Sequence, residues 1–258
     1  MAQKERLETI RRNIQLNKRV SVSVLSRELK VTEETIRRDL EKLEQEGVLT
    51  RTHGGAVRNA GRVMENSDYM LRKREHHQEK AMIGALAASV VPDRATVGAD
   101  ASTTVMEAVR LLRDRPELTI LTNSTQIICE LAQSPMKILS TGGMVNPATV
   151  SLQGKATRKA LADYYVDIAL ISCKALDLSG GIFDANEEEG EIKKLLVEHG
   201  QKIVLLADYS KFDRVAFTRV LDFENLDVLV TDREPSEAWR ELCAEKDVAL
   251  LYPGCGKS

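Results

Sequence analysis

The sequence predicts a small N-terminal helical domain followed by a larger α/β domain with a mainly parallel sheet. Residues 1–62 show helical periodicity and hold 14 Lys+Arg against 9 Asp+Glu, whereas the remainder holds 23 against 30. Beyond residue 75, short apolar strands alternate with helical segments, which is typical of a parallel sheet covered by helices. We therefore expect a first domain at residues 1–58, a linker at 59–74 and an α/β domain at 75–258.

Three helices with apolar inner faces are expected to form the core of residues 1–58. The inner residues are Leu7, Ile10 and Ile14 in Lys4–Leu16, Val24, Leu25 and Leu29 in a second helix begun by Ser21 or Ser23, and Ile36, Leu40 and Leu43 in Thr32–Glu46. Thr32 caps the third helix and Gly47 ends it. A break at Lys30-Val31 precedes this helix, and a two-strand excursion ends at Gly54-Gly55. An all-α core with such a wing is the layout of a winged helix-turn-helix.

The third helix is expected to enter a groove of double-stranded DNA. In this geometry its N-terminal residues reach base edges, while phosphate contacts fix its register. The candidate DNA-binding residues are Thr32, Thr35, Arg37, Arg38 and Lys42 on the helix and Arg51 and His53 in the wing. An arginine here either pairs with a guanine edge or holds a phosphate, and the sequence leaves both open.

The plainer alternative is a solvated helix face on which Arg37 and Arg38 pair with neighbouring acids. Those acids are Asp39, Glu41 and Glu34. The distribution of charge favours DNA binding, because a net charge of +5 through Arg62 is followed by −7 in the rest of the chain. A basic domain on an acidic one is expected where only the first meets a polyanion.

The segment TIRRDLEKLEQEGVLTRTHGGA, residues 35–56, resembles the signature of the DeoR family of bacterial transcriptional regulators. Thr35 to Leu40 match its recognition helix, and His53 to Ala56 match the end of its wing. Further matches continue downstream, so the resemblance covers nearly the whole chain. It implies that the N-terminal domain binds operator DNA.

The α/β domain is predicted element by element from its apolar runs and their Gly, Pro and Ser boundaries. Strands are expected at 95–100, 118–122, 137–140, 166–172, 202–207, 228–231 and 248–252. Helices are expected at 80–91, 103–112, 125–132, 155–163, 189–199 and 236–245.

Polar groups follow several of these strands, at the edge where open α/β sheets bind ligands. They are Asp100 with Ser102, Thr103 and Thr104, then Thr122, Asn123 and Ser124, then Gly142 and Gly143, and finally Lys211 after Asp208. Together they indicate a pocket for a polar, phosphorylated compound. Each group also has a structural explanation: the hydroxyls cap helices, the glycines allow positive φ, and Lys211 is a solvated surface lysine.

The same residues extend the resemblance, because the second domain looks like the effector-binding domain of the DeoR family, which is similar in fold to ribose 5-phosphate isomerase. Gly142, Gly143 and the segment EGEIKK, Glu189 to Lys194, are among the matched positions. The resemblance implies that Ser102, Thr103, Thr104, Asn123 and Lys211 hold the phosphate. It implies roles for Asp100 and Glu191 toward sugar hydroxyls or in interdomain signalling.

We expect a sequence-specific transcriptional regulator that represses a sugar-catabolic operon and is released by a phosphorylated sugar. The alternative is a sugar-phosphate isomerase with an appended DNA-binding domain. Isomerisation needs a carboxylate that moves a proton between adjacent carbons, and no acid follows Ile171 until Asp177. Asp177 or Glu188 would have to take that role. A general architectural DNA binder is disfavoured, because it needs no second domain.

Other classes of site receive little support from the sequence. The four cysteines, Cys129, Cys173, Cys243 and Cys255, form no CxxC pair, and the adjacent His76 and His77 lack an i,i+4 partner, so no metal or other cofactor is expected. No signal peptide or membrane-length apolar run is found, which favours the cytoplasm. Tight operator selection predicts a homo-oligomer, since two DNA-binding domains multiply affinity.

Overall fold

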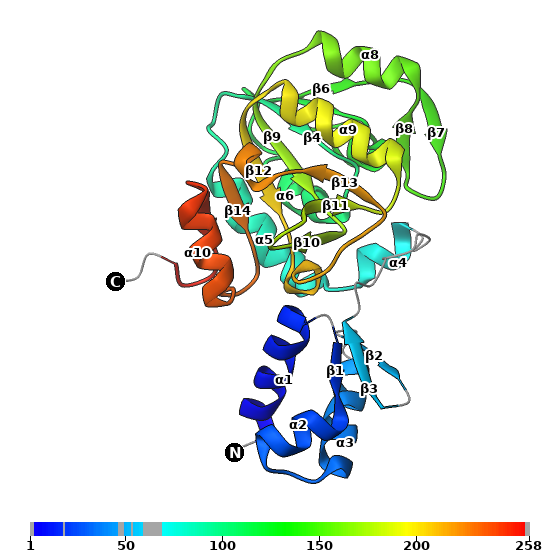
Figure 1. Ribbon diagram of the computed structural model, residues 1–258. Helices are drawn as coiled ribbons and strands as arrows, with labels where there is room; N and C mark the ends of the chain where they lie inside the picture. The colour runs from blue at the N-terminus through cyan, green and yellow to red at the C-terminus, as the bar shows by residue number, and fades with distance from the viewer. Residues whose placement is uncertain (1–2, 18, 46–48, 53, 59–68, 256–258) are drawn as a thin grey trace. The chain divides into compact units, whose positions relative to one another are not determined.

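The computed structural model describes residues 3–17, 19–45, 49–52, 54–58 and 69–255 (Figure 1). The chain divides into two compact units, the first of residues 1–64 with 213–215 and the second of residues 65–212 with 216–258. Each unit has its own hydrophobic core, and each is described by itself. No helix among the described residues is both long enough and apolar enough to cross a lipid bilayer.

The first unit is a three-helix core with a small antiparallel sheet (Figure 1). Its elements are α1 Gln3–Asn17, β1 Arg19–Ser21, α2 Val22–Leu29, α3 Glu33–Gln45, β2 Leu49–Thr52 and β3 Gly55–Arg58. The strands follow the order β1-β3-β2, so the predicted two-strand wing is extended by a third strand. This strand was not predicted, because it is only three residues long and is defined by its pairing with β3.

The inner faces of the three helices are mostly those predicted. Leu7, Ile10, Ile14, Leu25, Ile36, Leu40 and Leu43 are all buried. Val24 was wrongly assigned to the core, because α2 begins at Val22 and this earlier start turns Val22 and Leu25 inward. Val24 is instead 43% exposed. The expected end of α3 at Gly47 lies outside the described residues.

Local hydrogen bonds explain where α3 begins. The hydroxyl of Thr32 accepts a hydrogen bond from the amide of Thr35 at 3.2 Å, which confirms the predicted cap. The preceding helix ends at Leu29 and is followed by Lys30, whose φ of 54° reverses the chain. The turn between the two helices is therefore fixed by one left-handed residue and one hydroxyl cap.

The second unit is built on a seven-stranded, wholly parallel sheet with the order β15-β14-β12-β9-β4-β5-β6. Its strands are β4 Thr96–Ala99, β5 Thr119–Thr122, β6 Lys137–Ser140, β9 Val166–Ser172, β12 Gly200–Leu206, β14 Val228–Val230 and β15 Ala249–Leu251. The helices are α4 Tyr69–Arg74, α5 His77–Ser89, α6 Thr103–Leu111, α7 Thr125–Leu131, α8 Lys155–Asp163, α9 Glu187–Glu198 and α10 Glu237–Glu245. The predicted α/β domain with a mainly parallel sheet is confirmed.

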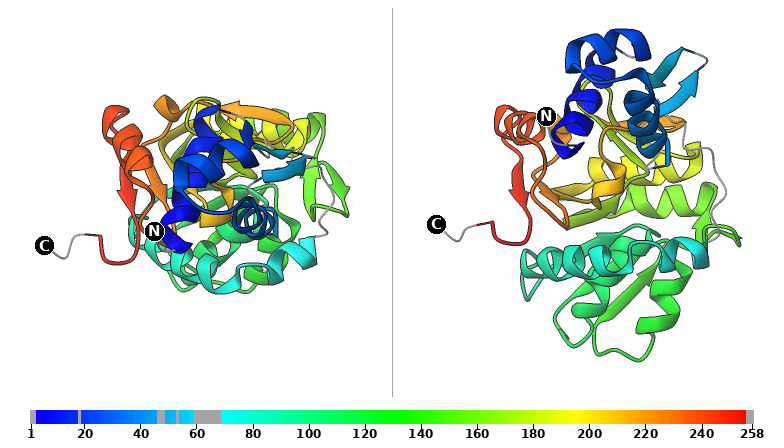
Figure 2. Two further views of the ribbon diagram at one scale, coloured as in Figure 1. Left: turned by 60° about the horizontal axis from the view of Figure 1, so that its bottom comes forward. Right: turned by 90° about the horizontal axis from the view of Figure 1, so that it is seen from below.

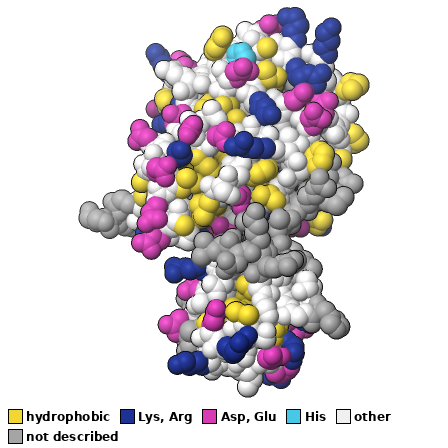
Figure 3. All heavy atoms as spheres, viewed as in Figure 1, with side chains coloured by type: hydrophobic (Ala, Val, Ile, Leu, Met, Phe, Trp, Pro, Cys, Tyr) yellow, Lys and Arg dark blue, Asp and Glu magenta, His cyan; other side chains and the backbone are white. Residues whose placement is uncertain are grey.

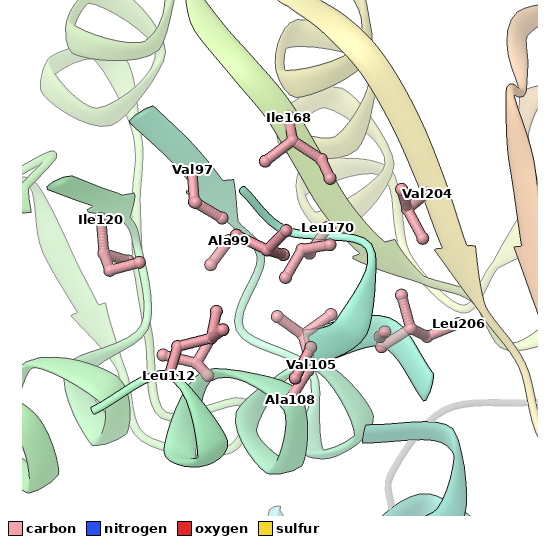
Figure 4. Close-up of a cluster of buried hydrophobic side chains, with 14 of the residues drawn as sticks. Val97, Ala99, Val105, Ala108, Leu112, Ile120, Ile168, Leu170, Val204 and Leu206 are labelled. Atoms are coloured by element: carbon pink, nitrogen blue, oxygen red, sulfur yellow. The ribbon is translucent and has the colours of Figure 1, made fainter. Parts of the chain in front are cut away.

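Helices cover both faces of this sheet (Figure 2). Alternate residues of each strand enter opposite cores, so Ile168 packs on one side and Ala169 on the other. Figure 4 shows the first core, in which Val105, Ala108 and Leu112 lie against the strands. The second core contains Ile192 and Leu196 of α9 and Trp239 of α10.

Several short elements were not predicted from the sequence. Strands β7 Met144–Asn146 and β8 Ser151–Gln153 form a hairpin, and β10 Ala175–Asp177, β11 Gly181–Asp184 and β13 Thr218–Leu221 form an antiparallel sheet. Two 3-10 turns are present, η1 Tyr209–Lys211 and η2 Phe223–Asn225. Residues 69–74, expected to be linker, form helix α4, and Tyr69 is buried.

Candidate functional site

The outer face of α3 carries the side chains expected to meet DNA. Arg37 and Arg38 are exposed to 54% and 77%, and Thr32 and Lys42 are also exposed. Thr35 is half-buried and shares a hydroxyl–hydroxyl hydrogen bond with Thr32 at 2.9 Å. The predicted polar stripe therefore lies on the surface, opposite the buried leucines.

The arginines of this face are paired within the helix. Arg37 lies 2.8 Å from Glu33, and Arg38 lies 3.5 Å from Glu34. Of the acids named as possible partners in the solvated-face alternative, Glu34 does pair with Arg38. Exposed pairs of this kind contribute only about 0.2–1 kcal/mol, so a base edge or phosphate can displace them.

Asp39 does not pair with either arginine. It is buried and accepts hydrogen bonds from Arg6 of α1, at 2.5 Å and 3.2 Å. These hydrogen bonds raise the pKa of Arg6 above its usual value despite the opposing effect of burial. Asp39 therefore anchors the recognition helix to α1 and takes no part in its outer surface.

The wing is tied to α3 by two glutamates. The amide of Arg51 donates a hydrogen bond to the carboxylate of Glu44 at 2.8 Å, and the exposed Arg51 guanidinium lies 3.8 Å from Glu41. His53, the second wing candidate, lies outside the described residues. Figure 3 shows basic and acidic side chains mixed on the visible surface of the first unit.

The second unit has a topological switch point between β4 and β9. From β4 the chain proceeds to β5 and β6 on one side, while β9, β12, β14 and β15 lie on the other. Ligands of open α/β sheets bind outside the carboxyl ends of the strands at such a point. Asp100 follows β4 and Lys174 follows β9, so polar side chains are present where a ligand is expected.

A buried ion cluster lies at this switch point. The ammonium of Lys193 is 3.2 Å from Asp100, 3.0 Å from Asp184 and 3.8 Å from Glu189. All four side chains are buried. Burial lowers the pKa of Lys193, but the carboxylates of Asp184, Asp100 and Glu189 more than reverse this and raise it above its usual value. Three carboxylates therefore face one ammonium.

Backbone and side-chain donors hold the carboxylates in place. Asp100 accepts from the amides of Ser102 and Ser172, both at 2.9 Å. Glu189 accepts from the hydroxyl of Ser151 and the amide group of Gln153, both at 3.0 Å. The cluster thus joins the ends of β4 and β9 to the hairpin strand β8.

The predicted phosphate ligands differ in burial and in their hydrogen bonds. The hydroxyl of Ser102 caps α6 by accepting from the amide of Val105, while Thr103 and Thr104 are buried in its first turn. Asn123 is buried, and its Oδ1 has no hydrogen-bond partner among the described residues. Ser102 thus has the capping role that the alternative interpretation gave it.

Gly142 and Gly143 have φ values of 64° and 119°. A Cβ at Gly143 would lie 2.1 Å from the hydroxyl of Thr157, and this hydroxyl donates to the carbonyl of Gly142 at 2.6 Å. Backbone geometry and close packing therefore require glycine at position 143.

The two remaining candidates, Glu191 and Lys211, form ion pairs with residues outside the Lys193 cluster. Glu191 is on the exposed side of α9, 3.2 Å from Arg158. Lys211 lies 3.7 Å from the buried Asp208. Of the predicted effector ligands, the structure brings Asp100 to the cluster. Lys193, Asp184 and Glu189 were not among the candidate ligands, although the i,i+4 spacing of Glu189 and Lys193 within EGEIKK was a usable signal.

Two family models match this arrangement. The DeoR-like helix-turn-helix domain matches residues 6–62, and the DeoR C terminal sensor domain matches residues 75–233. The chain belongs to the DeoR family of transcriptional regulators. The resemblance stated from the sequence is confirmed. The buried ion cluster lies within the part of the DeoR sensor domain that is matched.

Named DeoR-family relatives match over most of their length. The HTH-type transcriptional repressor GlcR of Bacillus subtilis is 33% identical over 97% of this chain and 96% of its own. The regulator YulB of the same organism is 36% identical over 88% of both chains. The L-fucose operon activator of Haemophilus influenzae is 30% identical over 90% of this chain and 93% of its own.

Solved structures similar to this DeoR-family chain share little sequence with it. Ribose 5-phosphate isomerase A of Methanocaldococcus jannaschii is 16% identical, covers 54% of this chain and 55% of its own, and has a TM-score of 0.40. A translation initiation factor eIF-2B of Pyrococcus horikoshii is 13% identical, covers 88% of this chain and 95% of its own, and has a TM-score of 0.47.

Among the described residues, no group of three or more His, Cys, Asp or Glu is arranged to hold a metal ion.

Proposed function

We propose that this DeoR-family regulator represses a sugar-catabolic operon and releases its operator when a phosphorylated sugar binds the sensor domain. The observation that carries the effector part is the buried cluster of Lys193 with Asp100, Asp184 and Glu189 at the switch point of the sheet. Buried ionisable groups with shifted pKa values cluster at functional sites, and Lys193 is such a group.

The chemistry of the cluster suits a polyhydroxylated ligand. Carboxylates accept hydrogen bonds from hydroxyl groups, and the ammonium donates to them. Because Asp100, Asp184 and Glu189 surround a single lysine, acceptor capacity remains for the hydroxyls of a sugar. We therefore assign the sugar-binding role to Glu189 in place of Glu191, whose carboxylate faces Arg158.

The names of the relatives support regulation of a sugar-linked operon, but they include both an activator and a repressor. Repression is therefore part of the proposal. One relative is called an L-fucose operon activator, and another is called a repressor. We favour repression because the repressor GlcR matches this chain over nearly its full length. Binding of operator DNA would put the protein in the cytoplasm, where a bacterial chromosome lies.

DNA binding is assigned to the outer face of α3 and to the wing. Thr32, Thr35, Arg37, Arg38, Lys42 and Arg51 are the proposed contacts, and His53 is retained from the sequence. A single winged domain contacts one half-site, so we expect a homo-oligomer that binds two. An effector with a coupling of ~1–3 kcal/mol would weaken operator binding about 5–150-fold.

The isomerase alternative has less support. The carboxylate of Asp177 accepts from the amide and hydroxyl of Ser179 two residues away, and Glu188 lies on the surface 3.2 Å from Arg158. The ion pairs of Lys193 are with Asp100, Asp184 and Glu189, whereas Glu188 pairs with Arg158. An isomerase assay with aldose phosphates tests this point, and turnover lost on changing Asp177 would favour the enzyme.

Fluorescence anisotropy tests the proposed function directly. A labelled duplex from upstream of the gene is titrated with the full chain, then with glucose 6-phosphate, ribose 5-phosphate, fructose 1-phosphate and fuculose 1-phosphate. We expect tight binding to this duplex, weaker binding to a shuffled duplex, and release by at least one phosphorylated sugar. The unphosphorylated sugars are the matched controls. Equal affinity for both duplexes would contradict the proposal.

A further inference from the structure

Lys174 follows strand β9 at the switch point and was not among the candidate residues from the sequence. We infer that Lys174 is the ligand for an anionic group of the effector, a phosphate monoester, whose sugar hydroxyls face the Lys193 cluster. This inference rests on the proposed function, because it names the residue that binds the phosphate of the same effector. Three steps support it.

The first step is the position of Lys174. Strands β9 and β12 are parallel neighbours in which Ser172 lies opposite Leu206. Lys174 and Asp208 stand two residues further along the two strands, so both lie just beyond this edge of the sheet. The amide of Lys174 donates to the carbonyl of Phe183 at 2.9 Å, and the next residue, Asp184, belongs to the Lys193 cluster. Lys174 is therefore adjacent to the proposed sugar site.

The second step is the state of its ammonium. Lys174 is partly buried, yet its ammonium makes no hydrogen bond or ion pair with any residue that the structure describes. The other lysines of this region are engaged. Lys193 is held by three carboxylates, Lys211 lies near Asp208, and Lys80 donates to the carbonyls of Arg72 and Glu75. The nearby carboxylates are thus already shared with other cations.

The third step is the local field. Burial, together with the charges of Arg72, Lys211 and Lys193, lowers the pKa of Lys174 to about 8, and the carboxylate of Asp184 opposes this shift. At neutral pH the ammonium is still mostly charged, although burial and these three cations disfavour its charged form. An anion bound there would remove this cost and restore the pKa of the lysine.

The two ends of the proposed ligand are therefore distinguished by charge. The carboxylate-rich cluster around Lys193 suits hydroxyl groups, and Lys174 suits a phosphoryl group. This arrangement differs from phosphate binding by Ser102, Thr103 and Thr104. The hydroxyl of Ser102 caps α6 by accepting a hydrogen bond from the amide of Val105, and Thr103 and Thr104 are buried in the first turn of that helix.

Calorimetric titration at several pH values tests the inference. The probes are inorganic phosphate and the sugar phosphates named above, with wild type, Lys174→Arg and Lys174→Gln. A phosphate monoester is already close to dianionic above pH 7, so a loss of affinity at higher pH reports a group on the protein. We expect wild type to lose about ten-fold in affinity between pH 7 and 9.5, and Lys174→Gln to bind about ten-fold more weakly at pH 7.

The Lys174→Arg variant should retain affinity across this pH range, because arginine stays charged. Lys159→Gln, on the surface and paired with Asp163, is the matched control and should behave as wild type. Circular dichroism without ligand checks that each variant is folded.

Three outcomes separate the two proposals. A sugar phosphate that binds wild type and Lys174→Gln equally would overturn the role of Lys174 and leave the proposed function intact. A pH profile unchanged in Lys174→Arg would overturn it as well. If no sugar phosphate binds and inorganic phosphate gives no Lys174-dependent heat, both the effector assignment and this inference fail.

Discussion

Single residues in this chain take their roles from partners that are distant in sequence. Asp39 lies among the basic residues of α3, and its spacing allows a surface pair with a neighbouring arginine. The structure instead buries it against Arg6, 33 positions earlier in the chain. Contact across such a separation leaves no periodic signal, so sequence analysis had no means of choosing between these partners.

The Arg6–Asp39 pair leads to a prediction about stability. Asp39→Asn leaves the buried guanidinium of Arg6 without its counter-charge, and breaking a buried pair in this way costs about 3–5 kcal/mol. Chemical denaturation followed by circular dichroism should show this loss. Glu41→Gln, on the exposed side of the same helix, is the control and should change the free energy of unfolding by less than about 0.5 kcal/mol. Similar losses in both variants would contradict the anchoring role of Asp39.

Arg38 leads to a prediction about DNA binding. Arg38→Ala should weaken operator binding by about 1–3 kcal/mol if the guanidinium meets a guanine, or reduce the salt dependence by about one ion if it meets a phosphate. Effector binding should be unchanged. Glu34→Gln is the matched control and should strengthen operator binding, because it releases Arg38 from its ion pair and removes a negative charge from the same face. Weaker DNA binding by both variants would argue against contact through this face.

At the scale of elements, the long buried strands were the most predictable part of the fold. Strands β9 and β12 each contain a run of four consecutive buried apolar residues, Ile168–Ile171 and Ile203–Leu206, which the sequence displays directly. The antiparallel strands β1 and β10 were missed, because each contains a polar residue in place of a continuous apolar run and is defined by its pairing partner.

The candidate site was predicted only where it follows the sheet. Asp100 was expected because it follows β4, whereas Asp184 comes from an unpredicted strand and Lys193 from the buried side of α9. Their convergence depends on how β11 and α9 pack around the switch point, and strand-end rules do not contain that information. The resemblance placed the segment EGEIKK in the site but did not identify which of its residues is buried.

The first turn of α9 leads to a prediction that links stability to ligand binding. Asn186 accepts from the amide of Glu189 at 2.8 Å, so Asn186→Ala removes a cap and loosens the turn that carries Glu189. We expect a loss of about 1 kcal/mol in unfolding free energy and weaker effector binding. Ser236→Ala is the control, because Ser236 precedes α10 without a side-chain cap bond. Calorimetry with the effector should be normal for Ser236→Ala, and an equal loss there would refute the role of Asn186.

At the scale of the whole molecule, charge separates the two units by task. The net charge is +5 through Arg62 and −7 beyond it, although the total is only −2. Such a chain is expected to approach a polyanion through its first unit and to keep the second unit away from the DNA backbone. The sequence alone was sufficient for this conclusion, because it requires only a count of residues.

This charge separation predicts a strong salt dependence of operator binding. If an oligomer neutralises six phosphates, affinity should fall about 10³-fold between 50 and 200 mM salt. Anisotropy measured across this range checks the slope. Effector affinity, measured by calorimetry under the same conditions, is the internal control, and we expect it to change much less. A flat dependence of operator affinity would exclude phosphate contacts as its main source.

The division of α3 into two faces has a consequence for how such regulators diverge. Ile36, Leu40, Leu43 and the Asp39 anchor hold the helix from within, whereas Arg37 and Arg38 contact only glutamates of their own helix among the described residues. Outer positions can therefore be exchanged one at a time without disturbing the fold. A descendant gene copy can acquire a new operator by mutation of a few surface codons, while its metabolite response is inherited unchanged.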